Sequence, residues 1–124
     1  MLTKDRAMTD PWKHIDVNQR SEVACVRLRR FRIEESDILE LTDELMRLAA
    51  TPGCKKMALS LGPRPPECLY SVFLAKLMTV QRRLADRGCS LVLCEVSPEV
   101  QAIFQVCHFA EYFQFVPDFD AAVV

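Results

Sequence analysis

The stretch from Cys89 to Val96, CSLVLCEV, constrains the fold more than any other part of the chain. Nearly all of its residues are apolar, and it is much shorter than a membrane span. Such a run is typical of a strand buried on both faces of a parallel sheet, with helices packed on either side. Ser97 and Pro98 follow as a helix N-cap and a first helical residue, so the strand leads into a helix.

The remaining segments alternate between strand and helix patterns. Strands are predicted at 14–17, 23–28, 56–61 and 113–116, with residues 18–21 as a hairpin turn. Helices are predicted at 36–50, at 72–87, from Pro98 onward and as a final turn after Asp118. Apolar stripes at helical spacing carry the first two, namely Ile38, Leu41, Leu45 and Leu48, and Phe73, Leu77, Val80 and Leu84. Parallel strands joined by helices, with a hairpin at one edge, predict an α/β fold: a mixed β-sheet of about five strands packed with about four helices.

The composition is that of one globular domain. The chain has 124 residues, 50% hydrophobic and 27% charged, which is enough for one core and too few for two. Residues 1–13 have no periodicity and are expected to form a flexible N-terminal arm, in which Trp12 docks on the domain or on a partner; the domain is placed at 14–124. The formal net charge of -1 does not favour nucleic acid, and no nucleic-acid partner is expected.

The six cysteines do not form a metal-binding pattern. No two are spaced as Cys-x-x-Cys, and His14 and His108 lack ligand-like spacing. Reduced cysteines in apolar runs behave as small core residues, and Cys107 is expected to face inward from the helix after Pro98. We predict no metal and no other cofactor. The absence of a signal peptide and of a membrane-length apolar run predicts a cytoplasmic protein.

The helix predicted at 72–87 begins beside a serine. A proline-rich loop at 62–67 leads to Tyr70 and Ser71, which places Ser71 at the N-cap or in the first turn. Unpaired backbone N–H groups and the positive end of the helix dipole favour a phosphate there, so Ser71 is either a phosphorylation site or an unmodified cap. Apolar neighbours, Val72 and Phe73, are typical of a protein interface if they are exposed.

The sequence has one basic cluster, RLRRFR, in which Arg27, Arg29, Arg30 and Arg32 flank Phe31. A basic run with an aromatic residue can contact the phosphates of a nucleic acid or an acidic surface on a protein. In a chain of balanced charge, a solvated strand end is the simpler interpretation. The predicted partner-binding residues form two groups: Arg30 and Arg32 from this cluster, and Tyr70, Ser71, Val72 and Phe73 from the start of the helix at 72–87.

Two segments, GCSLVLCEVSPEV at 88–100 and FAEYF at 109–113, resemble the STAS domain, the fold of bacterial anti-sigma factor antagonists. The first is similar to that family's strand, V-S-P-x-V turn and third helix, and the second to its G-L-x-x-x-F segment. The order of elements agrees over roughly residues 14–124. The resemblance implies a STAS-like mixed sheet and a non-catalytic regulatory module that binds other proteins in signal transduction.

The resemblance also implies a phosphorylation switch. In that family the loop before the second helix reads D-S-S-G-L-G, and its first serine is phosphorylated by a partner that is both serine kinase and anti-sigma factor. Ser71 matches this serine; the aspartate, second serine and first glycine are replaced here by Tyr70, Val72 and Phe73. The acidic G-E-L-D stretch of the family corresponds to residues 30–33, RFRI. A partner that recognises the acidic stretch should therefore bind this chain poorly.

Two other functions stay open. A nucleotide-binding STAS module is one, although the chain has no glycine-rich phosphate loop, and Cys107 and His108, as sequence neighbours, point to different sides of a helix. The other is a permanent subunit of a larger complex, such as a transporter-associated protein, in which the surface around Tyr70 is always covered. The oligomeric state is open as well.

Overall fold

The computed structural model describes residues 12–68 and 70–123. Its elements, in chain order, are β1 (Ile15–Arg20), β2 (Val23–Leu28), α1 (Glu35–Ala49), β3 (Lys56–Ser60), α2 (Tyr70–Asp86), β4 (Ser90–Cys94), α3 (Pro98–Val106), the 3-10 helix η2 (Ala110–Tyr112), β5 (Gln114–Val116) and α4 (Phe119–Val123). The sheet order is β1-β2-β3-β4-β5, with β1 antiparallel to β2 and the other neighbouring pairs parallel. Within the described residues, the predicted α/β fold with a mixed sheet of five strands and four α-helices is confirmed.

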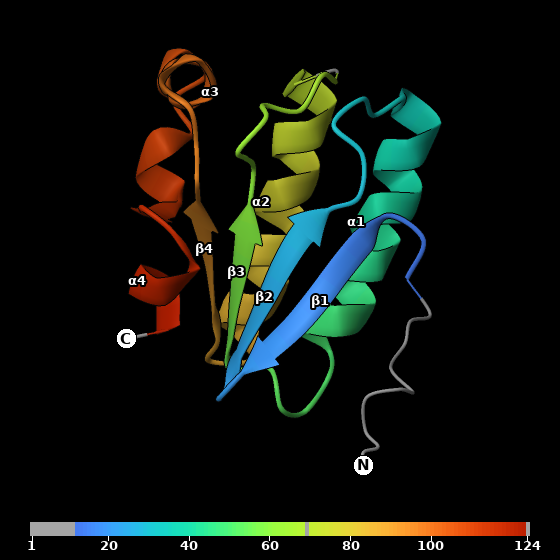
Figure 1. Ribbon diagram of the computed structural model, residues 1–124, viewed down its shortest axis with the longest axis vertical. Coiled ribbons are helices and arrows are strands. Elements are labelled where there is room, and N and C mark those ends of the chain that lie inside the picture. Colours follow the sequence, from blue (N-terminus) through green and yellow to red (C-terminus); the bar gives the residue numbers. More distant parts are fainter. Residues whose placement is uncertain (1–11, 69, 124) are drawn as a thin grey trace.

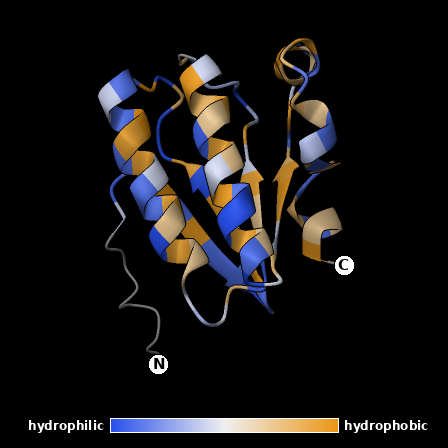
Figure 2. Cartoon of the chain, turned by 180° about the vertical axis from the view of Figure 1, so that it is seen from behind, coloured by the Kyte–Doolittle hydropathy of each residue, from blue (hydrophilic) through white to orange (hydrophobic). Residues whose placement is uncertain are grey.

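Helices cover both faces of the sheet, as the apolar strand at 89–96 predicts. α1 and α2 lie side by side on one face, behind the sheet in Figure 1. Their apolar stripes pack on alternate strand residues such as Val26, Met57 and Leu59. On the other face α4 places Ala122 against the small side chains of Cys25 and Ala58. Figure 2 shows the hydrophobic central strands behind α1 and α2, along which hydrophilic and hydrophobic residues alternate.

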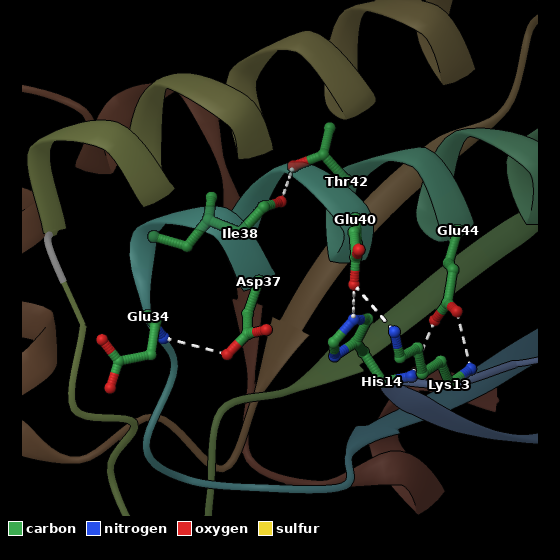
Figure 3. A network of polar contacts seen from close by, with 8 residues as sticks. All are labelled: Lys13, His14, Glu34, Asp37, Ile38, Glu40, Thr42 and Glu44. Atoms are coloured by element: carbon green, nitrogen blue, oxygen red, sulfur yellow. Dashed lines mark hydrogen bonds and ion pairs between the residues drawn. The ribbon is translucent and has the colours of Figure 1, made fainter.

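The two long helices bury the stripes that the sequence predicts. In α1 the buried stripe is Ile38, Leu41, Leu45 and Leu48, and in α2 it is Phe73, Leu77, Val80 and Leu84. α1 starts one residue earlier than predicted because Glu34 is its cap: the backbone N–H of Glu34 donates to the Asp37 carboxylate at 3.2 Å (Figure 3). α2 starts two residues earlier than predicted, at Tyr70.

The predicted N-terminal arm lies mostly outside the described residues, which begin at Trp12. Trp12 is half-buried against the main core, and the guanidinium of Arg47 lies 5.1 Å from its ring centroid. The backbone N–H of Lys13 donates to the Glu44 carboxylate at 2.6 Å. Of the two expectations for Trp12, docking on the domain is the one observed.

Several boundaries differ from the predictions for local reasons. β1 runs three residues further than predicted, because the turn is confined to Ser21 and Glu22 and Arg20 still pairs with Val23. β4 ends at Cys94, because Glu95 takes a left-handed backbone conformation with φ of 54°. The prediction that Cys107 faces inward is wrong: it follows the last residue of α3 and is exposed.

The carboxyl ends of β2, β3 and β4 meet at one edge of the sheet, at the top of Figure 1. α1 and α2 begin at this edge. Ligands and partners of open parallel sheets commonly bind at such an edge, where loops enter helix N-termini. No helix in the described ranges has the length and apolar character needed to cross a membrane.

Candidate functional site

The loops after β2 and β3 are joined at the carboxyl edge. Arg32 and Glu67 form a parallel β-bridge. The backbone N–H of Ile33 donates to the Glu67 carbonyl at 2.8 Å, and that of Glu67 donates to the Phe31 carbonyl at 2.5 Å. This bridge brings the basic segment at 29–32 next to the loop that leads into α2. The two groups of predicted partner-binding residues, one in the loop after β2 and one at the start of α2, therefore share one edge of the molecule.

Ser71 lies in the first turn of α2, as the second helical residue. Its side chain is exposed, and its hydroxyl makes no hydrogen bond to any of the described residues. The first turn of α2 contains no acidic residue. First-turn backbone N–H groups lack intrahelical partners, so the turn presents a positive end to solvent. An anion attached to this hydroxyl would meet favourable electrostatics.

The apolar neighbours of Ser71 do not all reach the surface. Tyr70 and Val72 are half-buried, but Phe73 is only 1% exposed and belongs to the main core. The prediction of Phe73 as a partner-binding residue is therefore wrong, because its place in the buried stripe of α2 turns its ring inward. Tyr70 donates its hydroxyl to the Pro66 carbonyl, and burial raises the pKa of this phenol to about 12. Tyr70 thus stays neutral and braces the loop before α2.

The basic segment forms the wall of an open pocket of about 610 Å³, lined by Arg29, Arg30, Phe31, Arg32, Arg64 and Glu67. Arg30 and Arg32 are both exposed, as a binding role requires. The sequence interpretation did not include Arg64, which comes from the loop after β3 and places its guanidinium 3.5 Å from the centroid of the Phe31 ring. The topology could have indicated Arg64, because the loops that follow two adjacent parallel strands lie side by side.

A second polar cluster ties the strand ends together. Ser60, which is 1% exposed, donates its hydroxyl to Glu95 at 2.5 Å, and Arg27 contacts the same carboxylate at 2.8 Å. Burial alone would raise the pKa of Glu95, but the hydrogen bonds from Ser60 and Arg27 lower it below its ordinary value. The lowered pKa makes the Glu95 carboxylate a weak base, and the buried Ser60 hydroxyl is not accessible to a substrate. We interpret this cluster as structural.

A third cluster, shown in Figure 3, joins β1 to α1. One ligand atom each from His14, Asp37 and Glu40 lies within 4.8 Å of the other two, a spacing that suits a metal ion. However, the ammonium of Lys13 is 3.4 Å from Glu40, and His14 contacts the same oxygen at 2.8 Å. Hydrogen bonds from His14 and Lys13 lower the pKa of the Glu40 carboxyl. The Lys13 ion pair and the His14 hydrogen bond already occupy the Glu40 carboxylate, so we assign no metal site to this cluster.

Comparison with solved structures identifies the fold. No family model matches the sequence, and no curated protein matches it significantly. The structure of an anti-sigma-factor antagonist (STAS) domain protein from Planctomyces limnophilus matches with a TM-score of 0.76 and 20% identity, over 88% of this chain and 94% of that one. The chain has the STAS fold. The resemblance of residues 88–100 and 109–113 is confirmed at the level of the fold.

Two further solved structures match most of the chain. The Bacillus cell fate determinant SpoIIAA in its phosphorylated form matches with a TM-score of 0.64 and 11% identity, over 87% of this chain and 96% of that one. A sulfate transporter family protein from Wolinella succinogenes matches with a TM-score of 0.64 and 18% identity, over 82% of each chain. At these identities the likeness establishes the fold alone, so function must be argued from the carboxyl edge.

Proposed function

We propose that this STAS-fold protein is a non-catalytic regulatory module that binds a protein partner through the carboxyl edge of its sheet and is switched by phosphorylation of Ser71. The observation that carries the proposal is the exposed Ser71 hydroxyl, which has no hydrogen-bond partner among the described residues and lies in the first turn of α2. The partner is a cytoplasmic anti-sigma factor with serine kinase activity. SpoIIAA, which shares the fold, has been solved in a phosphorylated form.

Phosphorylation at this position would act on the partner more than on the fold. The N–H groups of the first turn and the helix dipole stabilise a phosphate, so α2 stays intact. The partner surface includes the half-buried Tyr70 and Val72 beside Ser71. A phosphate carried into such an interface must be desolvated, and this weakens binding. The switch therefore releases the partner when Ser71 is modified.

The direct test is to incubate the full chain with Mg-ATP and the anti-sigma-type kinase encoded nearest to it, and then to measure intact mass and map the modified residue. The proposal predicts one added phosphoryl group, on Ser71, and none in Ser71→Ala. Ser36 is a matched control, because it is the exposed second residue of α1 just as Ser71 is of α2. An unmodified chain, or equal modification of Ser36, would remove the switch from the proposal.

A permanent subunit role is the second candidate, favoured by the match to the sulfate transporter family protein. In that case the surface at Tyr70 and Val72 would be covered at all times. Size-exclusion chromatography of the chain at native concentration, with Tyr70→Asp as the disrupting variant, separates the two. A complex that survives phosphorylation of Ser71 and dissociates in Tyr70→Asp supports the subunit role.

A further inference from the structure

The pocket lined by Arg29, Arg30, Arg32 and Arg64, here called the arginine pocket, has an excess of positive charge. Among the described residues of its lining, Glu67 is the only acidic one. The whole chain has 16 lysines and arginines against 17 acidic residues, so this excess is local. Within the described ranges, Arg32 pairs with Glu67 at 3.5 Å and Arg29 pairs with Asp16 at 2.9 Å. Arg30 and Arg64 have no described carboxylate within ion-pair distance.

The guanidinium groups are presented by a fixed frame. The backbone hydrogen bonds of Ile33 and Glu67 hold the two loops together. Arg64 lies over the face of Phe31, and such stacking limits the rotamers of a long side chain. An arginine that is ordered before binding loses less conformational entropy when it meets an anion. The pocket is therefore preorganised for carboxylates, which guanidinium groups bind with paired hydrogen bonds.

We propose that the arginine pocket binds an acidic segment of the partner protein. This inference rests on the proposed function and specifies the chemistry of its partner. It places the negative charge on the partner and the positive charge on this chain, with Arg30 and Arg64 making the direct contacts.

Two observations favour a short acidic peptide over a nucleic acid. Arg64 covers one face of the Phe31 ring, so that face is closed to a stacked base. A neighbouring pocket that shares Arg32 and Glu67 is also lined by Glu34 and Glu35. These carboxylates would repel a continuous phosphate backbone but tolerate a peptide whose acidic residues are few and local. That neighbouring pocket extends to Cys68, and so continues toward the start of α2.

The test is fluorescence anisotropy of the full chain with fluorescein-labelled hexaglutamate at low salt. The proposal predicts saturable binding that weakens as salt is added. Arg30→Ser combined with Arg64→Ser should raise the dissociation constant at least about tenfold. Arg82→Ser combined with Arg83→Ser is the matched control, because it removes the same charge from exposed positions on the distal half of α2, and it should change the dissociation constant by less than about twofold.

Glu67→Gln is a second test variant. It removes a carboxylate from the pocket and should tighten hexaglutamate binding, whereas a misfolded variant would only bind more weakly. Absence of saturable binding, equal loss in both double variants, or tighter binding of a labelled oligothymidylate through the same arginines would overturn the inference. Phosphorylation of Ser71 is measured without hexaglutamate. A chain that is phosphorylated on Ser71 but does not bind the peptide would leave the proposed function standing and remove only the inference.

Discussion

The guanidinium group of Arg27 contacts both carboxylate oxygens of Glu95, at 2.8 and 3.4 Å. Arg27 lies near the end of β2, and Glu95 directly follows β4, so the pair spans the intervening strand β3. Ser60, the last residue of β3, donates to the same carboxylate. Three parallel strands are thus fastened at the edge that carries the proposed partner surface.

Replacing Glu95 by glutamine should lower the free energy of unfolding by about 1 kcal/mol at pH 7, a value reduced by the 43% exposure of the Arg27 side chain. The pKa of Glu95 is lower in the folded state than its ordinary value of 4.5. Its stabilising contribution is therefore present above that value and is lost as the pH falls through the folded pKa. Urea unfolding at pH 7 and at pH 3 measures the difference, which should shrink in acid.

The control for this prediction is Glu22→Gln, in the exposed turn between β1 and β2. It should leave the free energy of unfolding within about 0.5 kcal/mol of the wild-type value. A Glu95→Gln variant as stable as the wild type at pH 7 would show that the contacts of Arg27 and Ser60 with Glu95 do not stabilise the fold.

Gly62 should not tolerate alanine. A Cβ atom there would lie 2.3 Å from the backbone carbonyl oxygen of Glu95, and the backbone cannot yield as a flexible side chain would. We expect Gly62→Ala to lower the free energy of unfolding by about 1–3 kcal/mol. Gly53→Ala is the matched variant, since nothing lies within 4 Å of its Cβ position. Thermal unfolding of both checks this; equal melting temperatures would contradict it.

Phe73 and Val72 are neighbours on α2 with different roles. Phe73→Ala should cost about 3–5 kcal/mol, because a buried aromatic ring leaves a cavity. Val72→Ala should cost less than about 1 kcal/mol, because its side chain is only half-buried. Partner binding should show the reverse order, with Val72→Ala the variant that loses affinity while it stays folded. Urea unfolding, combined with partner binding for the folded variant, separates the two effects.

The cysteines should differ in reactivity toward a thiol reagent. Burial raises the pKa of the Cys68 thiol to about 11, and burial with the nearby Glu95 charge raises that of Cys94 to about 12. Their reactive thiolates are therefore scarce at pH 8. Cys107 is exposed and should react first. A time course with Ellman's reagent should show a fast phase that Cys107→Ser removes; its persistence in the variant would place the reactive thiol elsewhere.

Most of the fold is predictable because apolar residues recur in regular patterns along the sequence. The apolar run at 89–96 implied a two-sided sheet, and the stripe led by Ile38 implied α1, because in both cases the same period repeats over many residues. Boundaries were less predictable, since single contacts decide them. The Glu34 cap and the left-handed conformation of Glu95 are examples, and neither has a pattern that repeats.

The candidate site was predictable only in part. Ser71 and the exposure of Arg30 and Arg32 follow from local sequence. The sequence places Phe73 both in an apolar stripe and beside the surface residue Ser71, and only its burial in the structure decides between the two. Arg64 lines the arginine pocket because β3 lies beside β2 in the sheet. Arg64 is too far along the chain from residues 29–32 for a local sequence pattern to connect them. Cys107 was misplaced because helical spacing does not show where α3 ends.

The carboxyl edge as a protein-binding surface is tested most directly by site-specific photo-crosslinking in the native host. Ala75 and Ala85 are exposed alanines of α2, the first one turn beyond Ser71 and the second near the opposite end. With p-benzoylphenylalanine in place of Ala75, the account predicts one discrete protein adduct, which is lost when Ser71→Glu is added. The same substitution of Ala85 should give none. No adduct from position 75, or the same adduct from both positions, would contradict the account.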